Sequence, residues 1–133
     1  MSLRLHESMA EHDASMMNGL QLAFMGDAVW SVIVREELIA RKYNVHHMHT
    51  ESIRFVSAKS QAAALERITP VLSGPEVEIV RRGRNAHSHH PVPKHQNPED
   101  YAAATGFEAL IGYLYLTGKE DRVLELAGMI IGG

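Results

Sequence analysis

Residues 20–34 read LQLAFMGDAVWSVIV and residues 102–116 read AAATGFEALIGYLYL, and each of these apolar helical stretches contains one acid. The acids are Asp27 and Glu108. A carboxylate on a packed helix face is costly unless a cationic side chain, hydrogen bonds or a metal ion compensates for its lost hydration. No Lys or Arg lies within four residues of either acid. The compensating charge must come from elsewhere in the fold, from a second subunit or from a bound cation, and a bound cation would indicate chemistry.

Length and composition predict a single domain of ordinary composition. The 133 residues are 45% hydrophobic and include no cysteine, which excludes disulfides and thiolate metal sites. The first residues, MSLRLHESMAEHDASMM, lack the continuous apolar stretch of a signal peptide, and no segment is apolar for long enough to span a membrane. We therefore expect a cytoplasmic protein. The formal charge of -3 argues against a general nucleic-acid coat, although net charge does not say where the charges lie.

The spacing of apolar residues predicts an all-α fold, since no alternating strand pattern is present. Residues 1–14 have no apolar period and are expected to be a loosely ordered N-terminal segment, with the folded domain over 15–133. The first long helix is expected from the N-cap Asn18 to about Arg41. Its expected apolar positions are Leu20, Phe24, Val29, Ile33, Leu38 and Ile39.

Caps and prolines predict the remaining helices. A second helix is expected from Thr50 or Ser52 to just before Pro70, with a bend at Ser57 or Ser60. A short helix is expected from Pro75 to near Gly83, followed by a loop over 84–96. The clearest boundary is Asn97 and Pro98, which open the helix that carries Glu108 and ends near Gly118. The last helix is expected to end at Gly132, with inward residues Val123, Leu124, Ala127 and Ile130.

Four ordered sequence blocks resemble a known family. LAFMGDAVWSVIVREELI (22–39) resembles the signature helix of the ribonuclease III catalytic domain, and TGFEALIGYLYL (105–116) resembles the second acidic block of that family. With FVSAKSQAAAL (55–65) and RRGRNAHS (81–88) between them, the chain resembles the mini-ribonuclease III branch, which lacks a double-stranded-RNA-binding domain. The resemblance implies an all-α, ribonuclease III-like endonuclease domain, a helical bundle that forms a two-fold homodimer.

The resemblance also implies the site and its cofactor. Asp27 and Glu108 are the expected catalytic residues and the expected ligands of Mg²⁺, with Mn²⁺ as an alternative, and two carboxylates suffice because Mg²⁺ keeps several waters. Larger members of the family carry two further acids, at positions that are Ala23 and Thr105 in this chain. Many relatives also have Glu where this chain has Ser31. These departures leave the number of metal ions open and indicate a thinned metal site.

A basic patch without an internal acid lies just before the Glu108 helix. Its residues Arg81, Arg82, Arg84 and Lys94 are expected to contact phosphates, which is favoured over a role in solubility. The full set of expected RNA contacts is Arg81, Arg82, Arg84, Asn85, Lys94 and Lys59. The histidines of this loop, and His46, His47 and His49, are interpreted as solvent-facing rather than as a zinc cluster, because no acid or cysteine accompanies them.

The resulting hypothesis is a metal-dependent endoribonuclease that cuts double-stranded RNA, each site of the homodimer cutting one strand. The resemblance further implies maturation of the 23S ribosomal RNA, with a ribosomal protein that presents the duplex. Two alternatives stay open at this stage. One is a noncatalytic RNA-binding or ribosome-binding module that has kept the fold, which Ala23 and Thr105 would allow. The other is an α-helical nucleotide pyrophosphohydrolase, for which Glu36 and Glu37 do not supply the usual cluster of acids.

Overall fold

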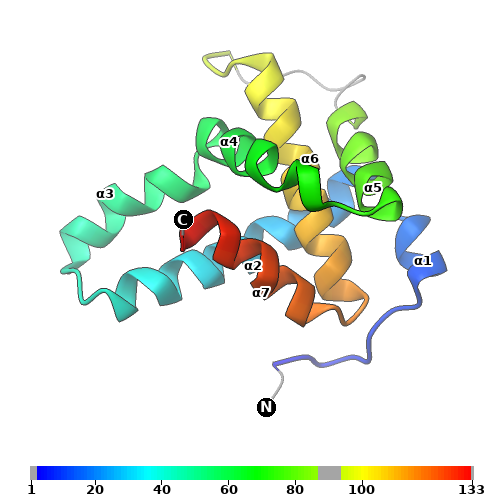
Figure 1. Ribbon diagram of the computed structural model, residues 1–133, viewed down its shortest axis with the longest axis horizontal. Helices are drawn as coiled ribbons and strands as arrows, with labels where there is room; N and C mark the ends of the chain where they lie inside the picture. The colour runs from blue at the N-terminus through cyan, green and yellow to red at the C-terminus, as the bar shows by residue number, and fades with distance from the viewer. Residues whose placement is uncertain (1–2, 87–93, 133) are drawn as a thin grey trace.

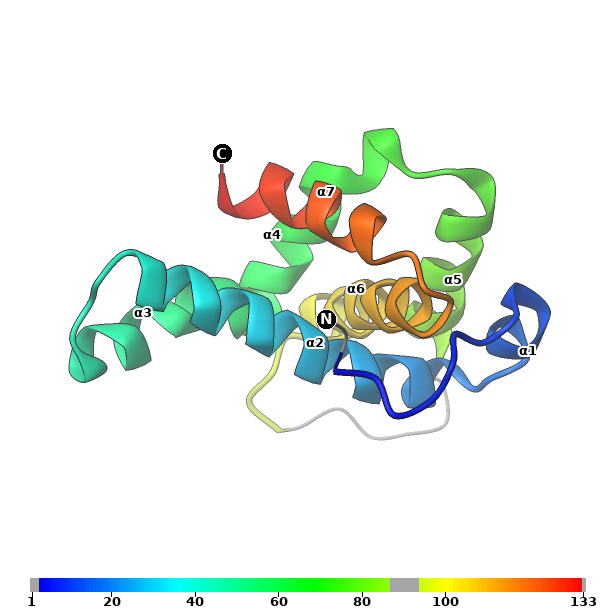
Figure 2. The ribbon, with the colours of Figure 1, turned by 90° about the horizontal axis from the view of Figure 1, so that it is seen from below.

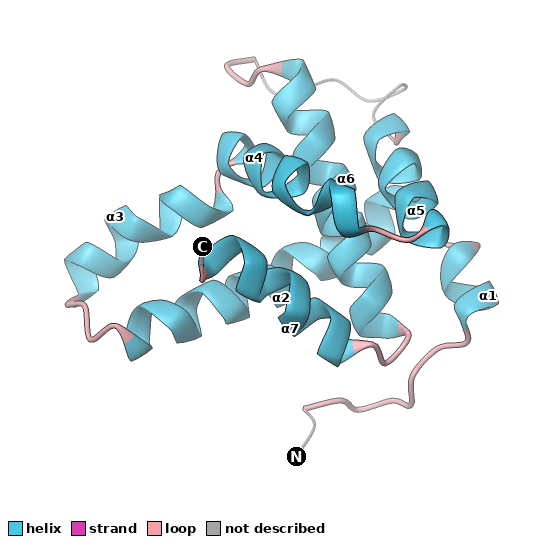
Figure 3. Cartoon of the chain, viewed as in Figure 1, coloured by secondary structure: helices cyan, strands magenta, loops and turns pink. Residues whose placement is uncertain are grey.

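The computed structural model describes residues 3–86 and 94–132. All the regular secondary structure in these ranges is helical (Figure 3). The all-α prediction is therefore confirmed for the described residues. Within the same ranges, no helix combines the length and the apolar character needed to cross a membrane. The elements are α1 (Glu11–Ser15), α2 (Gly19–Ala40), α3 (Val45–Val56), α4 (Ala58–Ile68), the 3-10 turn η1 (Thr69–Val71), α5 (Gly74–Asn85), α6 (Pro98–Leu116) and α7 (Glu120–Ile131).

Helix α6 forms the centre of the domain. Viewed nearly along its axis, it is surrounded by α2, α4, α5 and α7, all of which contact it (Figure 2). A helix that is apolar on all sides is stable only when neighbours cover it on all sides, and the sequence of α6 has this character. The rings of Trp30 and Phe107, both fully buried, meet edge to face with centroids 5.0 Å apart. The core is thus built around the helix that carries Glu108.

Helix α2 carries apolar residues on two faces, and the structure buries one of them. Its inward residues follow a four-residue spacing that includes Leu22, Trp30 and Val34. By contrast, Phe24 is 83% exposed and Ile39 is 62% exposed, although both belong to the apolar spacing that predicted the helix. The predicted helix is present, but apolar spacing alone did not indicate which of its faces is inward. Phe24, Val32 and Ile39 on the outward face of α2 are left exposed by the described residues of the single chain.

The segment predicted as one bent helix is two helices. Helix α3 begins at Val45, several residues before the predicted start, because the side chain of Asn44 caps it by accepting from the backbone N–H of His47. The break falls at Ser57, whose backbone is extended and whose hydroxyl accepts from the N–H of Ser60 to cap α4. Helix α3 has no fully buried residue, so its start leaves no apolar signal. In Figure 1 it projects from the rest of the domain.

Other helix boundaries agree with the caps in the sequence. Asn18 forms a capping box with Gln21, and the Asn97 side chain accepts from two backbone N–H groups at the start of α6. Helix α5 continues to Asn85, two residues beyond the predicted end, so the expected loop begins later than predicted. In α7, Leu124 is 60% exposed instead of inward, whereas Val123 is buried as expected.

The N-terminal segment contacts the end of α6. The backbone N–H of Met9 donates to the carbonyl oxygen of Leu116 at 2.8 Å, and Ala14 in α1 is fully buried. Arg4 stacks over the ring of Tyr115 and forms an ion pair with Glu120. The domain boundary expected between residues 14 and 15 stays a prediction.

Candidate active site

Two glycines allow the backbones of α2 and α6 to touch where the helices cross. A Cβ atom placed on Gly26 would lie 1.7 Å from the carbonyl oxygen of Glu108, and one on Gly112 would lie 2.0 Å from the carbonyl oxygen of Leu22. Only glycine permits this approach, because any other residue would force the helices apart. Asp27 directly follows Gly26 in α2. The crossing therefore brings Asp27 next to Glu108, although the two residues are 81 positions apart in the sequence.

The two carboxyl groups form a coupled pair. Glu108 is half-buried and Asp27 is exposed, and the side chains lie within hydrogen-bonding distance of each other. Burial, followed by the hydrogen bond and the charge of Asp27, raises the pKa of Glu108 to about 8. Neither acid has a Lys, Arg or His partner among the ion pairs of the described residues. Of the sources that the sequence left open, ion pairs among the described residues do not supply the charge, and a second subunit or a bound cation remains.

One buried polar side chain also reaches this pair. Gln61 in α4 is 2% exposed, and its Nε2 donates to Oε2 of Glu108 at 3.4 Å. A hollow of about 310 Å³ lies beside these two residues and is open to solvent. Its lining comes from the α3–α4 junction, from α4, from the start of α6 and from the segment before it: Val56, Ser57, Ala58, Gln61, Gln96, Tyr101, Ala104, Thr105 and Glu108.

Gln61 lies in the FVSAKSQAAAL block of the family resemblance, but it was not among the predicted site residues. The available signal was its spacing, since Gln61, Leu65 and Ile68 follow a helical period and are all buried. A polar residue at such a position requires a partner, just as the two acids do. The partner, Glu108, lies 47 residues away in sequence and could not be identified without the fold.

The carboxylate oxygens of Asp27 and Glu108 suit Mg²⁺, which needs few ligands from the protein. Among the described residues, no group of three or more His, Cys, Asp or Glu is arranged to hold a metal ion. Ala23 is buried, and the hydroxyl of Thr105 donates to the carbonyl oxygen of Tyr101 at 3.0 Å, so neither position adds a carboxylate. Mg²⁺ takes oxygen ligands and commonly binds one or two carboxylates with several waters. The Asp27 and Glu108 pair meets that requirement.

The expected basic patch is divided by the structure. Arg81 forms an ion pair with Glu78, an acid one turn earlier in α5. The guanidinium of Arg82 is partly buried and donates to the backbone carbonyl oxygens of Ser15 and Met17, which ties α5 to the segment before α2. These two side chains already have partners within the protein. The prediction that they stand together in an acid-free patch did not account for Glu78 or for the backbone of residues 15–17.

The other expected RNA contacts are exposed. Arg84 and Asn85 lie in the last turn of α5, Lys59 lies in α4, and Lys94 lies just before α6. Lys59 and Lys94 form no ion pair within the part of the chain that the structure describes. Arg84 lines a hollow with three acids, Glu66, Glu99 and Asp100. Lys59 and Lys94 are therefore the cations of this set that are exposed and have no acidic partner among the described residues.

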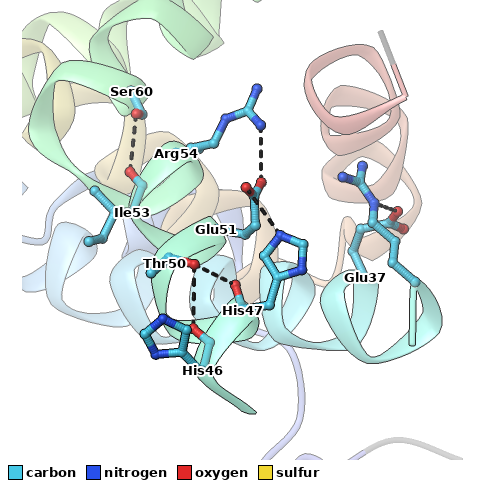
Figure 4. Close-up of polar contacts among 9 residues, drawn as sticks. Glu37, His46, His47, Thr50, Glu51, Ile53, Arg54 and Ser60 are labelled. Atoms are coloured by element: carbon cyan, nitrogen blue, oxygen red, sulfur yellow. Dashed lines mark hydrogen bonds and ion pairs between the residues drawn. The ribbon is translucent and has the colours of Figure 1, made fainter. Parts of the chain in front are cut away.

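The histidines of α3 lie on the projecting helix, away from the acid pair. His46 and His47 are exposed, and Nε2 of His47 lies 3.5 Å from Oε1 of Glu51, which also pairs with Arg54 (Figure 4). The ring of His47 stacks on Tyr43 with centroids 3.9 Å apart. These contacts are those of a solvated helix face. His87, His89 and His90, which were predicted to face solvent, lie outside the described residues.

Comparisons with known proteins identify the family and the fold of the chain. The model of the ribonuclease III domain matches residues 20–119. The chain is 48% identical over 108 residues to mini-ribonuclease 3 of Symbiobacterium thermophilum, covering 80% of this chain and 82% of that protein. It is 45% identical over 119 residues to mini-ribonuclease 3 of a Thermoanaerobacter species, covering 86% and 83%. A crystal structure of a Fusobacterium nucleatum protein matches with a TM-score of 0.81 at 31% identity, covering 87% of this chain and 94% of that one.

Proposed function

The chain belongs to the ribonuclease III domain family, in its mini-ribonuclease 3 branch, and we propose that Asp27 and Glu108 form its active site with Mg²⁺. The protein is a ribonuclease III-type endoribonuclease, a family that acts on double-stranded RNA and is typically metal-dependent. The observation that carries the assignment is the pairing of two carboxyl groups, of which Glu108 lines a hollow and has its pKa raised to about 8. Among the described residues, no cationic side chain forms an ion pair with either acid. Such a pair is suited to a bound cation.

Each residue has a distinct part in the proposed site. The exposed Asp27 and the half-buried Glu108 supply carboxylate oxygens from two helices whose crossing is fixed by glycine contacts. When bound there, Mg²⁺ would neutralise phosphate charge, promote deprotonation of a water and stabilise the leaving 3'-oxygen. The hollow beside Glu108 gives solvent access on the side of Tyr101 and Gln96. The protein positions the scissile phosphate, and the rigid α2–α6 crossing keeps the two acids in register.

The proposed substrate is duplex RNA, in particular the precursor of 23S ribosomal RNA. A-form RNA is recognised mainly by shape, phosphates and 2'-hydroxyls, and a small helical domain can supply such contacts without reading bases. The exposed Lys59, Arg84, Asn85 and Lys94 are the proposed phosphate contacts. Because these cations are few, affinity for free duplex should be modest. A ribosomal protein that presents the duplex would compensate for this weak binding.

The proposed assembly is a homodimer through the outward face of α2. Phe24 and Val32 are 83% and 61% exposed, and a hollow of about 330 Å³ runs between α2 and α7. Apolar side chains dominate its lining, among them Met25, Val29 and Leu124. An apolar face of this extent is typical of an interaction surface. Trp30, by contrast, is fully buried in the domain's own core and is not available for this interface.

The rival function is a noncatalytic RNA-binding module. The closely paired acids argue against it, because a module that only binds a polyanion gains nothing from two carboxylates at its surface hollow. A cleavage assay with purified protein and duplex RNA, with Mg²⁺ or with EDTA, tests the proposal. We expect Mg²⁺-dependent cutting that Asp27→Asn and Glu108→Gln each reduce by orders of magnitude, whereas Asp121→Asn in α7 leaves it near wild type. Binding without cutting in every condition would favour the rival.

A further inference from the structure

Gln61 occupies a position that packing alone would give to an apolar residue. It lies on the face of α4 that packs against α6, in line with the buried Leu65 and Ile68, and only 2% of it is exposed. A buried carboxamide costs roughly 1–3 kcal/mol when its polar atoms lack partners. An apolar side chain of similar size would avoid this cost. The presence of Gln at this position therefore calls for an explanation in terms of its partner.

That partner is Glu108. Among the described residues, the side chain of Gln61 makes one hydrogen bond, from Nε2 to Oε2 of Glu108 at 3.4 Å. The donor approaches one carboxylate oxygen from α4, whereas Asp27 approaches the carboxyl group from α2. Both Gln61 and Glu108 line the hollow beside the acid pair. A single carboxyl group is thus held between an amide donor and a second carboxyl group.

From this arrangement we infer that Gln61 is a positioning residue that orients the carboxylate of Glu108 for cation binding. The inference rests on the proposed Mg²⁺ site. With Oε2 held by the amide, rotation about the last side-chain bond of Glu108 is restricted, and Oε1 would be free to bind a cation together with Asp27. Partners that orient a metal ligand commonly change metal affinity by about 10-fold to 100-fold when they are removed. A chain with only two acidic ligands depends strongly on such orientation.

Hydrogen bonds of the N-cap fix the first turn of α4, which contains Gln61. The Ser57 hydroxyl caps the helix through the N–H of Ser60, and it also donates to the hydroxyl of Ser60 at 2.8 Å. Ser60 is the residue before Gln61, and α4 packs closely on α6. The capped first turn therefore fixes where the Gln61 side chain starts.

The test uses Gln61→Met, which keeps a similar length and volume but has no amide donor. Binding of Mn²⁺ and of Mg²⁺ to the full-length protein is measured by titration calorimetry without RNA, alongside melting temperatures in EDTA. We expect at least a 10-fold weaker affinity for the cation and a melting temperature in EDTA that is not lowered. Cleavage at limiting Mg²⁺ should fall, and saturating Mg²⁺ should recover much of the rate. Glu76→Gln, a destabilising change in α5, serves as the control for stability and should keep wild-type cation affinity.

The outcomes separate this inference from the proposed function. If the wild-type protein binds no cation, the proposed metal site fails. If the wild type binds and Glu108→Gln does not, while Gln61→Met binds as tightly as the wild type, the site stands and the role of Gln61 is wrong. Gln61→Leu is measured in parallel, so that a folding defect of one variant does not decide the result. Unchanged cation affinity in whichever variant folds overturns the inference.

Discussion

Gly26 of α2 lies against the backbone of Glu108 in α6 so closely that a Cβ atom on the glycine would stand 1.7 Å from the carbonyl oxygen of Glu108. The reciprocal contact joins Gly112 to the carbonyl oxygen of Leu22. These contacts set both the spacing of the core and the distance between the two acids. The packing of the core and the geometry of the proposed active site therefore depend on the same helix crossing.

Replacing Gly26 with Ala should separate α2 from α6. We expect a loss of several kcal/mol in the free energy of unfolding and a loss of cleavage, because overpacking forces backbone shifts. Gly128→Ala in α7 is the matched control, since a Cβ there meets nothing within 4 Å. It should raise stability by roughly 0.5–1 kcal/mol through the better helix propensity of Ala. Urea unfolding of the three proteins checks this, and equal stability of Gly26→Ala and wild type would contradict the close crossing.

Glu108 should make the metal-free protein less stable as pH rises. Its folded pKa of about 8 lies above the value of about 4.3 for an unfolded Glu, so the folded state holds the proton more tightly between these values. Stability from this group is fully present below about pH 4.3 and declines, by up to about 1.4 kcal/mol per pH unit, until about pH 8.

The variant Glu108→Gln cannot ionise at this position. In EDTA at pH 8 it should melt at a higher temperature than the wild type, and the advantage should disappear near pH 4. Addition of Mg²⁺ should stabilise the wild type and leave the variant unchanged. A variant that melts below the wild type at pH 8 in EDTA would contradict the raised pKa.

Glu76 should show the opposite pH dependence. It is 7% exposed, and its ion pair with Arg122 at 2.8 Å lowers its pKa. The stabilisation is present above the unfolded pKa of about 4.3 and is lost as pH falls through the lower folded value. At pH 7, Glu76→Gln should lose about 1–2 kcal/mol of unfolding free energy, because solvent reaches Arg122 and weakens the pair. Glu125→Gln removes the exposed partner of Arg122 and should change the thermal midpoint little.

The divided basic patch predicts unequal effects on RNA binding. Lys59→Ala should weaken duplex affinity similarly across sequences and reduce the salt slope by about one, as expected for one lost phosphate contact. Arg81→Ala should change affinity less, since Arg81 is already paired with Glu78. Arg82→Ala should lower the melting temperature, because it removes the hydrogen bonds to Ser15 and Met17. Filter binding at several salt concentrations checks the first two, and an unchanged slope for Lys59→Ala would remove it from the interface.

The outward face of α2 predicts the oligomeric state. Phe24→Glu should convert a dimer into a monomer, because it places a charge in the centre of an apolar interface. Val77→Glu is the matched control, since Val77 is a 48% exposed apolar residue in α5, outside the proposed interface. Light scattering at micromolar concentration distinguishes the two. A Phe24→Glu protein with the mass of the wild-type dimer would contradict this interface.

The sequence by itself determined the all-α class, the long helices and their polar caps, because apolar periodicity and residues such as Asn18 and Asn97 act within one or two turns. It also identified Asp27 and Glu108 as acids that need compensation, since each breaks an apolar pattern locally. The start of α3 was missed because that helix has no fully buried residue. Local patterns carry this much information because caps and periods are properties of neighbouring residues.

Only the tertiary structure decided which apolar face of α2 is inward, which arginines are already paired and which side chain supports Glu108. Phe24 and Trp30 both lie in the apolar stretch of α2, and contacts with α6 and α3 place Trp30 in the core. Gln61 and Glu108 belong to different helices, so their hydrogen bond exists only once α4 lies against α6. The physical reason is the same in each case: burial and pairing depend on contacts between residues distant in sequence, and the helical period gives no information about the partner.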